Sequence, residues 1–151
     1  MAGWTNRHKY NHLNWVYRAA TIPTNFYAAL VTSAVAPAAD INTKSELTEI
    51  ANGNGYTTGG ISLARNSTDF DVLTEDDAND RALIQIKDLV WTASGGSLPG
   101  SGGGARYAVL TDDNATQGSR EIGPFWDLTA DRSVSVGQTL TLQNCEIRIN
   151  D

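Results

Sequence analysis

Apolar and polar residues alternate strictly near the C-terminus, between Ser133 and Ile149. The apolar residues form two sets, Val134, Val136, Leu140 and Leu142, followed by Cys145, Ile147 and Ile149. A period of two is typical of a strand with one buried face and one face in water. The apolar parity shifts by one residue across Gln143-Asn144, so a bend or bulge must absorb the slip. We therefore expect a strand, a turn at Gly137-Gln138 and a long bent strand.

Short runs with strand character recur along the rest of the chain. They are residues 25–32 with Phe26, Ala28 and Leu30 alternating, residues 61–63, residues 82–91 with Ile84, Ile86 and Val90 on one face, residues 105–113, and residues 122–128. The turn dipeptides between them are Asn52-Gly53, Asn54-Gly55 and Gly59-Gly60, with Tyr56 and the pair Ile61/Leu63 starting strands on either side of the last.

Three segments lack strand character. Residues 33–46 are poor in large apolar residues and predict a surface excursion, and residues 67–80 predict an acidic loop. Residues 92–104 hold six glycines and a proline, which predicts a flexible loop. Seven or eight short strands separated by such turns predict an all-β fold, a jelly-roll-like β-sandwich or barrel, formed as one domain by residues 21–151.

The N-terminal segment has a different pattern. Over residues 5–18, Thr5 can cap a helix, and Tyr10, Leu13 and Tyr17 form a stripe at helical spacing. Residues 1–20 are therefore expected to form an N-terminal helical arm that precedes the sandwich.

Charge is distributed unevenly over the chain, whose formal net charge is −6. The first 39 residues contain Arg7, Lys9 and Arg18 but no acidic residue. The acidic remainder argues against nucleic-acid binding, because phosphate contacts need a basic surface. The N-terminus lacks the apolar core of a secretory signal, and no apolar run is long enough to span a bilayer, so we expect no membrane association.

Aromatic residues are concentrated in the same N-terminal segment. Three of the five tyrosines and two of the four tryptophans lie in the first 27 residues. Trp, Tyr and Arg dominate protein interfaces, so the candidate partner-binding residues are Trp4, Arg7, Tyr10, Trp15, Tyr17 and Arg18. The alternative is that these aromatic residues cover one end of the sandwich.

Few residues are arranged for chemistry. His8 and His12 have a spacing that suits two metal ligands, but no acidic residue or cysteine near them in the sequence completes a site. No serine has the sequence context of a hydrolase nucleophile, and Gly95–Gly104 lacks the Lys of a phosphate-binding loop. The lone Cys145 falls on a buried face and predicts a core residue. We predict no catalytic residues, no cofactor and no metal, and hence no enzyme.

Several short motifs together resemble a known group of proteins. They are residues 25–33, Thr48-Glu49, residues 52–56, residues 107–110 with Asp112, residues 125–128, Val134, residues 137–140, Ile147 and Ile149. Their order is similar to that of small virion structural proteins of tailed bacteriophages. The chain departs from that pattern at Thr57-Thr58, where the group tends to carry Ala-Arg, and in the long Gly95–Gly104 loop.

The resemblance implies a jelly-roll-like domain located in the virion after synthesis in the host cytoplasm. It implies a capsid decoration (cement) protein that binds the major capsid protein or other virion proteins, stabilises the shell and is a homo-oligomer. Two alternatives stay open. One is a tail, baseplate or fibre component. The other is a carbohydrate-binding module that uses Trp91, Trp126 and calcium bound by residues 69–80.

Overall fold

The computed structural model describes residues 2–150, which form ten strands, one α-helix and three short 3-10 helices. The strands are β1 (Ala2–Trp4), β2 (Asn25–Val31), β3 (Ile61–Ala64), β4 (Val72–Asp76), β5 (Arg81–Ile86), β6 (Leu89–Thr92), β7 (Ala105–Thr111), β8 (Ile122–Arg132), β9 (Thr139–Leu142) and β10 (Cys145–Asn150). The helices are α1 (Asn6–Tyr17), η1 (Lys44–Glu46), η2 (Asp77–Asn79) and η3 (Gln117–Ser119).

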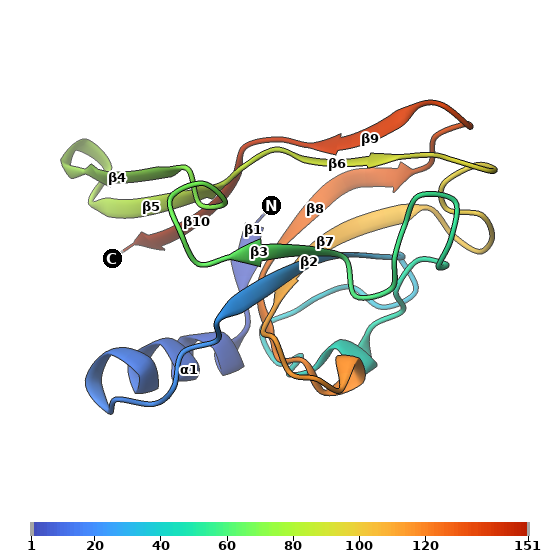
Figure 1. Ribbon diagram of the computed structural model, residues 1–151. Coiled ribbons are helices and arrows are strands. Elements are labelled where there is room, and N and C mark those ends of the chain that lie inside the picture. The colour runs from blue at the N-terminus through green and yellow to red at the C-terminus, as the bar shows by residue number, and fades with distance from the viewer. Residues whose placement is uncertain (1, 151) are drawn as a thin grey trace.

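The strands form two antiparallel layers (Figure 1). One layer is a five-stranded sheet of order β1-β8-β7-β2-β3, and the other combines the sheet β10-β5-β4 with the pair β6-β9. The prediction of an all-β sandwich with an N-terminal helix is confirmed. The jelly-roll connection pattern stays a prediction.

The main hydrophobic core lies between the two layers. From the five-stranded sheet it contains Ala28, Leu30, Leu63, Ala108, Leu110 and Trp126. From the opposite layer it contains Ile86, Leu89, Trp91, Leu140, Leu142 and Cys145. Cys145 is buried as predicted, and burial raises the pKa of its thiol to about 11. The side chain therefore stays protonated at neutral pH and packs as a small apolar group.

A second, smaller core covers the outer face of the five-stranded sheet. Ala29, Val31, Val109 and Ile122 point to this side and pack under Leu47, which follows η1. Residues 33–46, predicted as a surface excursion, and the residues that follow them thus cover the outer face of β2. From Ala28 to Val31, β2 is buried on both faces. The predicted alternation of Phe26, Ala28 and Leu30 therefore identifies only the face that packs into the main core.

The predicted change of parity near the C-terminus is confirmed. Asn144 has φ of 55° between β9 and β10, so Leu142 and Cys145 both face the core although they are three residues apart. The strands that pair with β9 and β10 are interrupted at the corresponding position: Lys87-Asp88 separate β5 from β6 opposite Gln143-Asn144. The prediction of a single strand over residues 82–91 with Val90 inward is therefore wrong: Leu89 and Trp91 are buried and Val90 is exposed.

Three further expectations need correction. The acidic segment 67–80 is not simply a loop, because it contains β4, which forms a hairpin with β5. Tyr56 lies in a tight turn, paired with Gly53, and starts no strand. The glycine-rich segment 92–104 is anchored by Leu98, which is fully buried and exchanges backbone hydrogen bonds with Val134 at 2.9 Å.

The N-terminal residues are integrated into the sandwich. The predicted helix is confirmed, with Thr5 as its N-cap. Ahead of it, β1 pairs with β8 as the edge strand of the five-stranded sheet, so the segment 1–20 supplies a strand as well as the helix. Residues 2–150 include no helix that is long and apolar enough to cross a membrane.

Candidate protein-binding surface

The start of α1 is held by one buried threonine. The hydroxyl of Thr5 accepts a hydrogen bond from the backbone N–H of His8 at 3.1 Å and donates one to the carbonyl of Ile122 at 2.5 Å. The backbone N–H of Asn6 donates to the carbonyl of Ala39 at 2.7 Å. These bonds satisfy helix N–H groups that would otherwise lack partners and join α1 to β8 and to the 33–46 excursion.

The inward face of α1 is aromatic. His8 contacts Trp4 and Trp15 edge-on, with ring centroids 5.0 and 5.5 Å apart, and Trp15 contacts Phe26 of β2 at 6.4 Å. A Cβ atom at Gly123 would lie 2.8 Å from Nδ1 of His8, so glycine is what lets β8 pass this close to the helix. Helix and sheet are therefore in direct contact.

His8 is held in its neutral form by this packing. Burial, and secondarily the neighbouring His12, lowers the pKa of His8 from 6.5 to about 4. No group of three or more His, Cys, Asp or Glu side chains that could hold a metal ion occurs within residues 2–150. Both imidazoles contact Trp4, with the His12 ring 5.9 Å from the indole.

The outward face of α1 is apolar and exposed. The exposed fractions are 56% for Tyr10, 58% for Leu13, 57% for Val16 and 78% for Tyr17. The stripe of Tyr10, Leu13 and Tyr17 faces outward, and the opposite stripe of His8, Asn11 and Trp15 packs against the sheet. Helical spacing alone could not decide between two stripes that both contain aromatic residues.

The structure divides the six candidate partner-binding residues into two groups. Tyr10, Tyr17 and Arg18 are exposed, whereas Trp4 and Trp15 are half-buried against the protein itself. Arg7 is also half-buried and forms a surface ion pair of 3.6 Å with Glu121. The expected residues therefore do not form one surface, and the exposed patch includes Leu13 and Val16, which were not expected.

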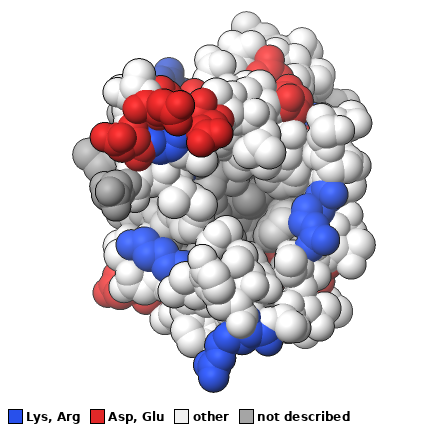
Figure 2. Space-filling view, turned by 90° about the vertical axis from the view of Figure 1, so that its left-hand side faces the viewer, with Lys and Arg blue, Asp and Glu red and all other residues white. Residues whose placement is uncertain are grey.

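A groove of about 300 Å³ runs beside this helix. It lies between α1 and the strands β4, β5 and β10, and its lining is almost entirely apolar, including Trp4, His12, Phe70, Leu83 and Ile147. Figure 2 looks onto the left-hand side of Figure 1, where the β4–β5 hairpin lies above α1.

One edge of the groove is acidic. The hairpin segment 71–80 carries Asp71, Glu75, Asp76, Asp77 and Asp80. Within it, Asp76 is paired with Arg81 at 2.7 Å, and hydrogen bonds from Asn79 and then Arg81 hold the pKa of its carboxyl below the usual value. The segment considered for calcium binding, residues 69–80, is therefore not an open loop. It contains β4 and the turn to β5, and its Asp76 is already paired with Arg81.

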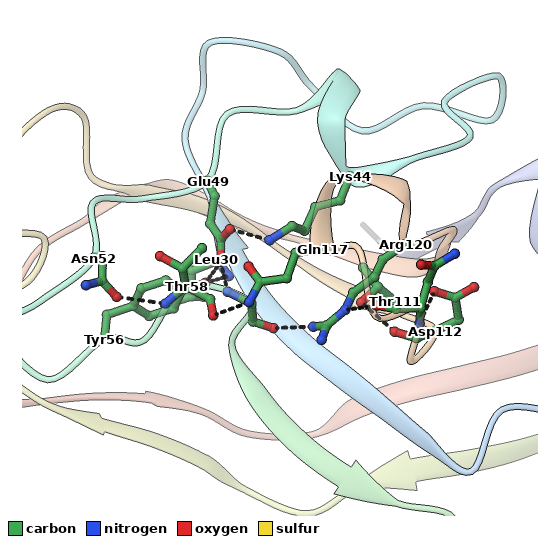
Figure 3. A network of polar contacts seen from close by, with 12 residues as sticks. Leu30, Lys44, Glu49, Asn52, Tyr56, Thr58, Thr111, Asp112, Gln117 and Arg120 are labelled. Atoms are coloured by element: carbon green, nitrogen blue, oxygen red, sulfur yellow. Dashed lines mark hydrogen bonds and ion pairs between the residues drawn. The ribbon is translucent and has the colours of Figure 1, made fainter.

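A buried polar network holds the excursion to the sheet (Figure 3). The carboxylate of Glu49 accepts hydrogen bonds from the Tyr56 hydroxyl and from the backbone N–H of Gly59, both at 2.6 Å, and is paired with Lys44. The Tyr56 hydroxyl accepts a hydrogen bond from Leu30 N–H of β2 at 3.0 Å. Burial, then Glu49, raises the pKa of Tyr56, so the phenol stays neutral.

Arg120 extends this network on the same side of the sheet. Its guanidinium lies 3.7 Å from the ring centre of Tyr27 and donates to the carbonyls of Asn114 at 3.1 Å and Gly59 at 3.4 Å. No side-chain nitrogen or oxygen atom that is itself fully buried lacks a hydrogen-bond partner in the described part of the chain. Such full pairing is typical of a structural network.

The aromatic residues suggested for carbohydrate binding are not available for it. Trp91 is only 3% exposed, and Trp126 is 8% exposed. The Trp126 Nε1–H donates to the carbonyl of Glu146 at 3.0 Å. Because sugar stacking needs an open aromatic face, these two positions do not support a carbohydrate-binding module.

Comparison with protein-family models, with curated proteins and with solved structures finds no match to this chain.

Proposed function

We propose that this protein is a structural component of a tailed-bacteriophage virion, a capsid decoration protein that binds the major capsid protein and stabilises the shell. The observation that carries the proposal is the outward face of α1, where Tyr10, Leu13 and Tyr17 are each more than half exposed. Exposed apolar patches on folded domains mark sites of protein association. The resemblance of the short motifs to those of virion structural proteins suggests the class of partner.

Rigid presentation of that face supports binding. Thr5 is fully buried and bonded to β8, and Trp15 packs on Phe26, so the helix is already ordered before any partner arrives. A preorganised surface loses little conformational entropy on binding. Tyrosine adds apolar area with few rotatable bonds, which is why it is frequent among residues that dominate binding energy.

Charge on α1 also suits an acidic partner. Arg18, at the C-terminal end of the helix, is exposed, and the helix has no acidic residue. A complementary patch of opposite charge on the partner would speed association more than it would raise affinity. We therefore expect binding to weaken moderately as the salt concentration rises.

The test is co-sedimentation of the purified protein with empty capsids and, separately, with isolated tails of the encoding phage. Deletion of residues 1–20 is unsuitable, because it would remove β1 and the Thr5 contacts with β8. The double variant Tyr10→Ala/Tyr17→Ala removes the two exposed rings and leaves the inward face intact. We expect it to reduce capsid affinity roughly ten- to a hundredfold.

The matched control is Val90→Ala/Val136→Ala, which truncates two exposed apolar side chains outside α1. It should bind capsids like the wild type. Saturable binding to tails alone would move the protein to the tail, baseplate or fibre class. Wild-type capsid affinity in the tyrosine variant, or no binding to either particle, would overturn the proposal.

A further inference from the structure

The rim of the groove beside α1 is unusually apolar for a surface that faces water. Val16 and Ile22 on the N-terminal side, and Leu73 and Ile149 on the opposite side, line the groove and are 57%, 38%, 77% and 51% exposed. Scattered exposed apolar residues are ordinary, but several around one apolar hollow indicate a surface that is covered in the functional state.

Opposite charges flank this groove. On the hairpin side, Glu75, Asp77 and Asp80 are exposed and have no ion-pair partner within residues 2–150. On the other side, Arg65 lines the groove, and Lys9 shares the side of α1 that carries His12 and Val16, at three- and seven-residue spacing. In Figure 2 the largest group of acidic side chains lies in the upper part of the face, and most Lys and Arg lie lower, where a smaller acidic group is seen at the left.

We infer that a second copy of this chain covers the groove, in a two-fold symmetric dimer. A two-fold axis through the groove sets the apolar rim of one copy on the apolar rim of the other. The same rotation sets the acidic hairpin of each copy against Lys9 and Arg65 of its partner. Such an isologous contact uses one self-complementary patch twice, which is the commonest form of homodimer.

The same charges argue against the other symmetric contact that this side of the molecule offers. β4 is an edge strand, and two copies could in principle pair along it. An antiparallel pair of β4 strands would bring Asp71, Glu75 and Asp76 of both copies into one short ladder. Like charges directly opposite each other destabilise a sheet, so the face with the groove is the better interface.

The test is the oligomeric state of the purified protein, measured by sedimentation equilibrium up to about 100 µM, well above the micromolar range of weak dimers. Because the protein is studied alone, the result is independent of the proposed capsid partner. We expect a dimer whose dissociation constant rises at least tenfold in Leu73→Asp. Val136→Asp, which places the same charge in the exposed turn before β9, should dimerise like the wild type.

A charge exchange tests the orientation of the two copies. Lys9→Glu alone and Asp77→Lys/Asp80→Lys alone should each weaken the dimer, and the triple variant should restore it. Circular dichroism and thermal unfolding establish that each variant is folded. A monomeric wild type at all concentrations, an unchanged dimer in Leu73→Asp, or a triple variant no tighter than its parents would each overturn the inference.

Discussion

Trp126 of β8 and Glu146 of β10 join the two layers of the sandwich through a single hydrogen bond. The indole Nε1–H donates to the Glu146 carbonyl at 3.0 Å, on the edge of β10 that does not face β5. The bond satisfies a backbone carbonyl that the edge strand would otherwise leave open, while the indole ring fills the core. Closure on this side of the sandwich therefore depends on a side chain instead of a strand ladder.

Trp126→Phe should destabilise the protein by about 2 kcal/mol, because the carbonyl of Glu146 loses its donor and the ring loses volume. Urea unfolding, followed by tryptophan fluorescence and circular dichroism, measures the change. Trp91→Phe is the control, since Trp91 is also a core residue but its indole makes no hydrogen bond within the described residues. The same loss in both variants would show that the Trp126–Glu146 bond adds nothing.

Tyr56→Phe should destabilise the fold by about 1–3 kcal/mol, because it leaves Leu30 N–H without its acceptor and removes a donor to Glu49. The measurement is the free energy of unfolding in urea. Tyr107→Phe is the matched control, since Tyr107 is half-buried and its hydroxyl has no hydrogen bond among residues 2–150. If both variants kept wild-type stability, the network around Glu49 would have no net stabilising role.

Stability should fall as the pH drops from about 6.5 towards 4. The pKa of His8 is about 4 in the folded protein and 6.5 in the unfolded chain, so between these values the unfolded chain binds more protons. The contribution is fully present above pH 6.5 and is lost as the pH falls to 4, by as much as about 3 kcal/mol.

The variant His8→Gln isolates this contribution. Its free energy of unfolding should depend less on pH between 4 and 6.5 than that of the wild type, whatever its absolute stability. His12→Gln should keep most of the wild-type slope, because burial, the larger cause of the lowered His8 pKa, remains. A slope in His8→Gln equal to that of the wild type would mean that His8 is not the titrating group.

Gly60→Ala should destabilise the protein by at least about 3 kcal/mol. The residue has φ of +80°, and an added Cβ would lie 1.9 Å from the carbonyl oxygen of Ala28, a backbone atom of β2 that has little room to move. Gly53→Ala is the control: φ is +102°, but the Cβ meets nothing within 4 Å, so only the strain of about 1 kcal/mol remains. Thermal unfolding compares the two, and equal losses would contradict the steric argument.

The candidate surface could be predicted only in part. Tyr10, Tyr17 and Arg18 were expected to be available for contact and are exposed, but Trp4 and Trp15 belong to the packing of α1 on β2 and β8. Composition identifies a segment rich in aromatic residues and cannot tell which of two helical faces meets the sheet. That choice depends on Phe26, which the sequence places on a strand with no indication that a helix covers it.

Local patterns by themselves determined the class of fold, the capped helix after Thr5, and the break between Leu142 and Cys145, because alternation and capping depend on near neighbours in the chain. Only the tertiary structure decided that residues 72–76, within the acidic segment, form a strand and that β2 is buried on both faces. Those outcomes depend on β5 pairing beside β4 and on Leu47 packing over Val31, contacts between residues far apart in sequence. The groove beside α1 has the same origin, since its walls come from residues as distant as Val16, Leu73 and Ile149.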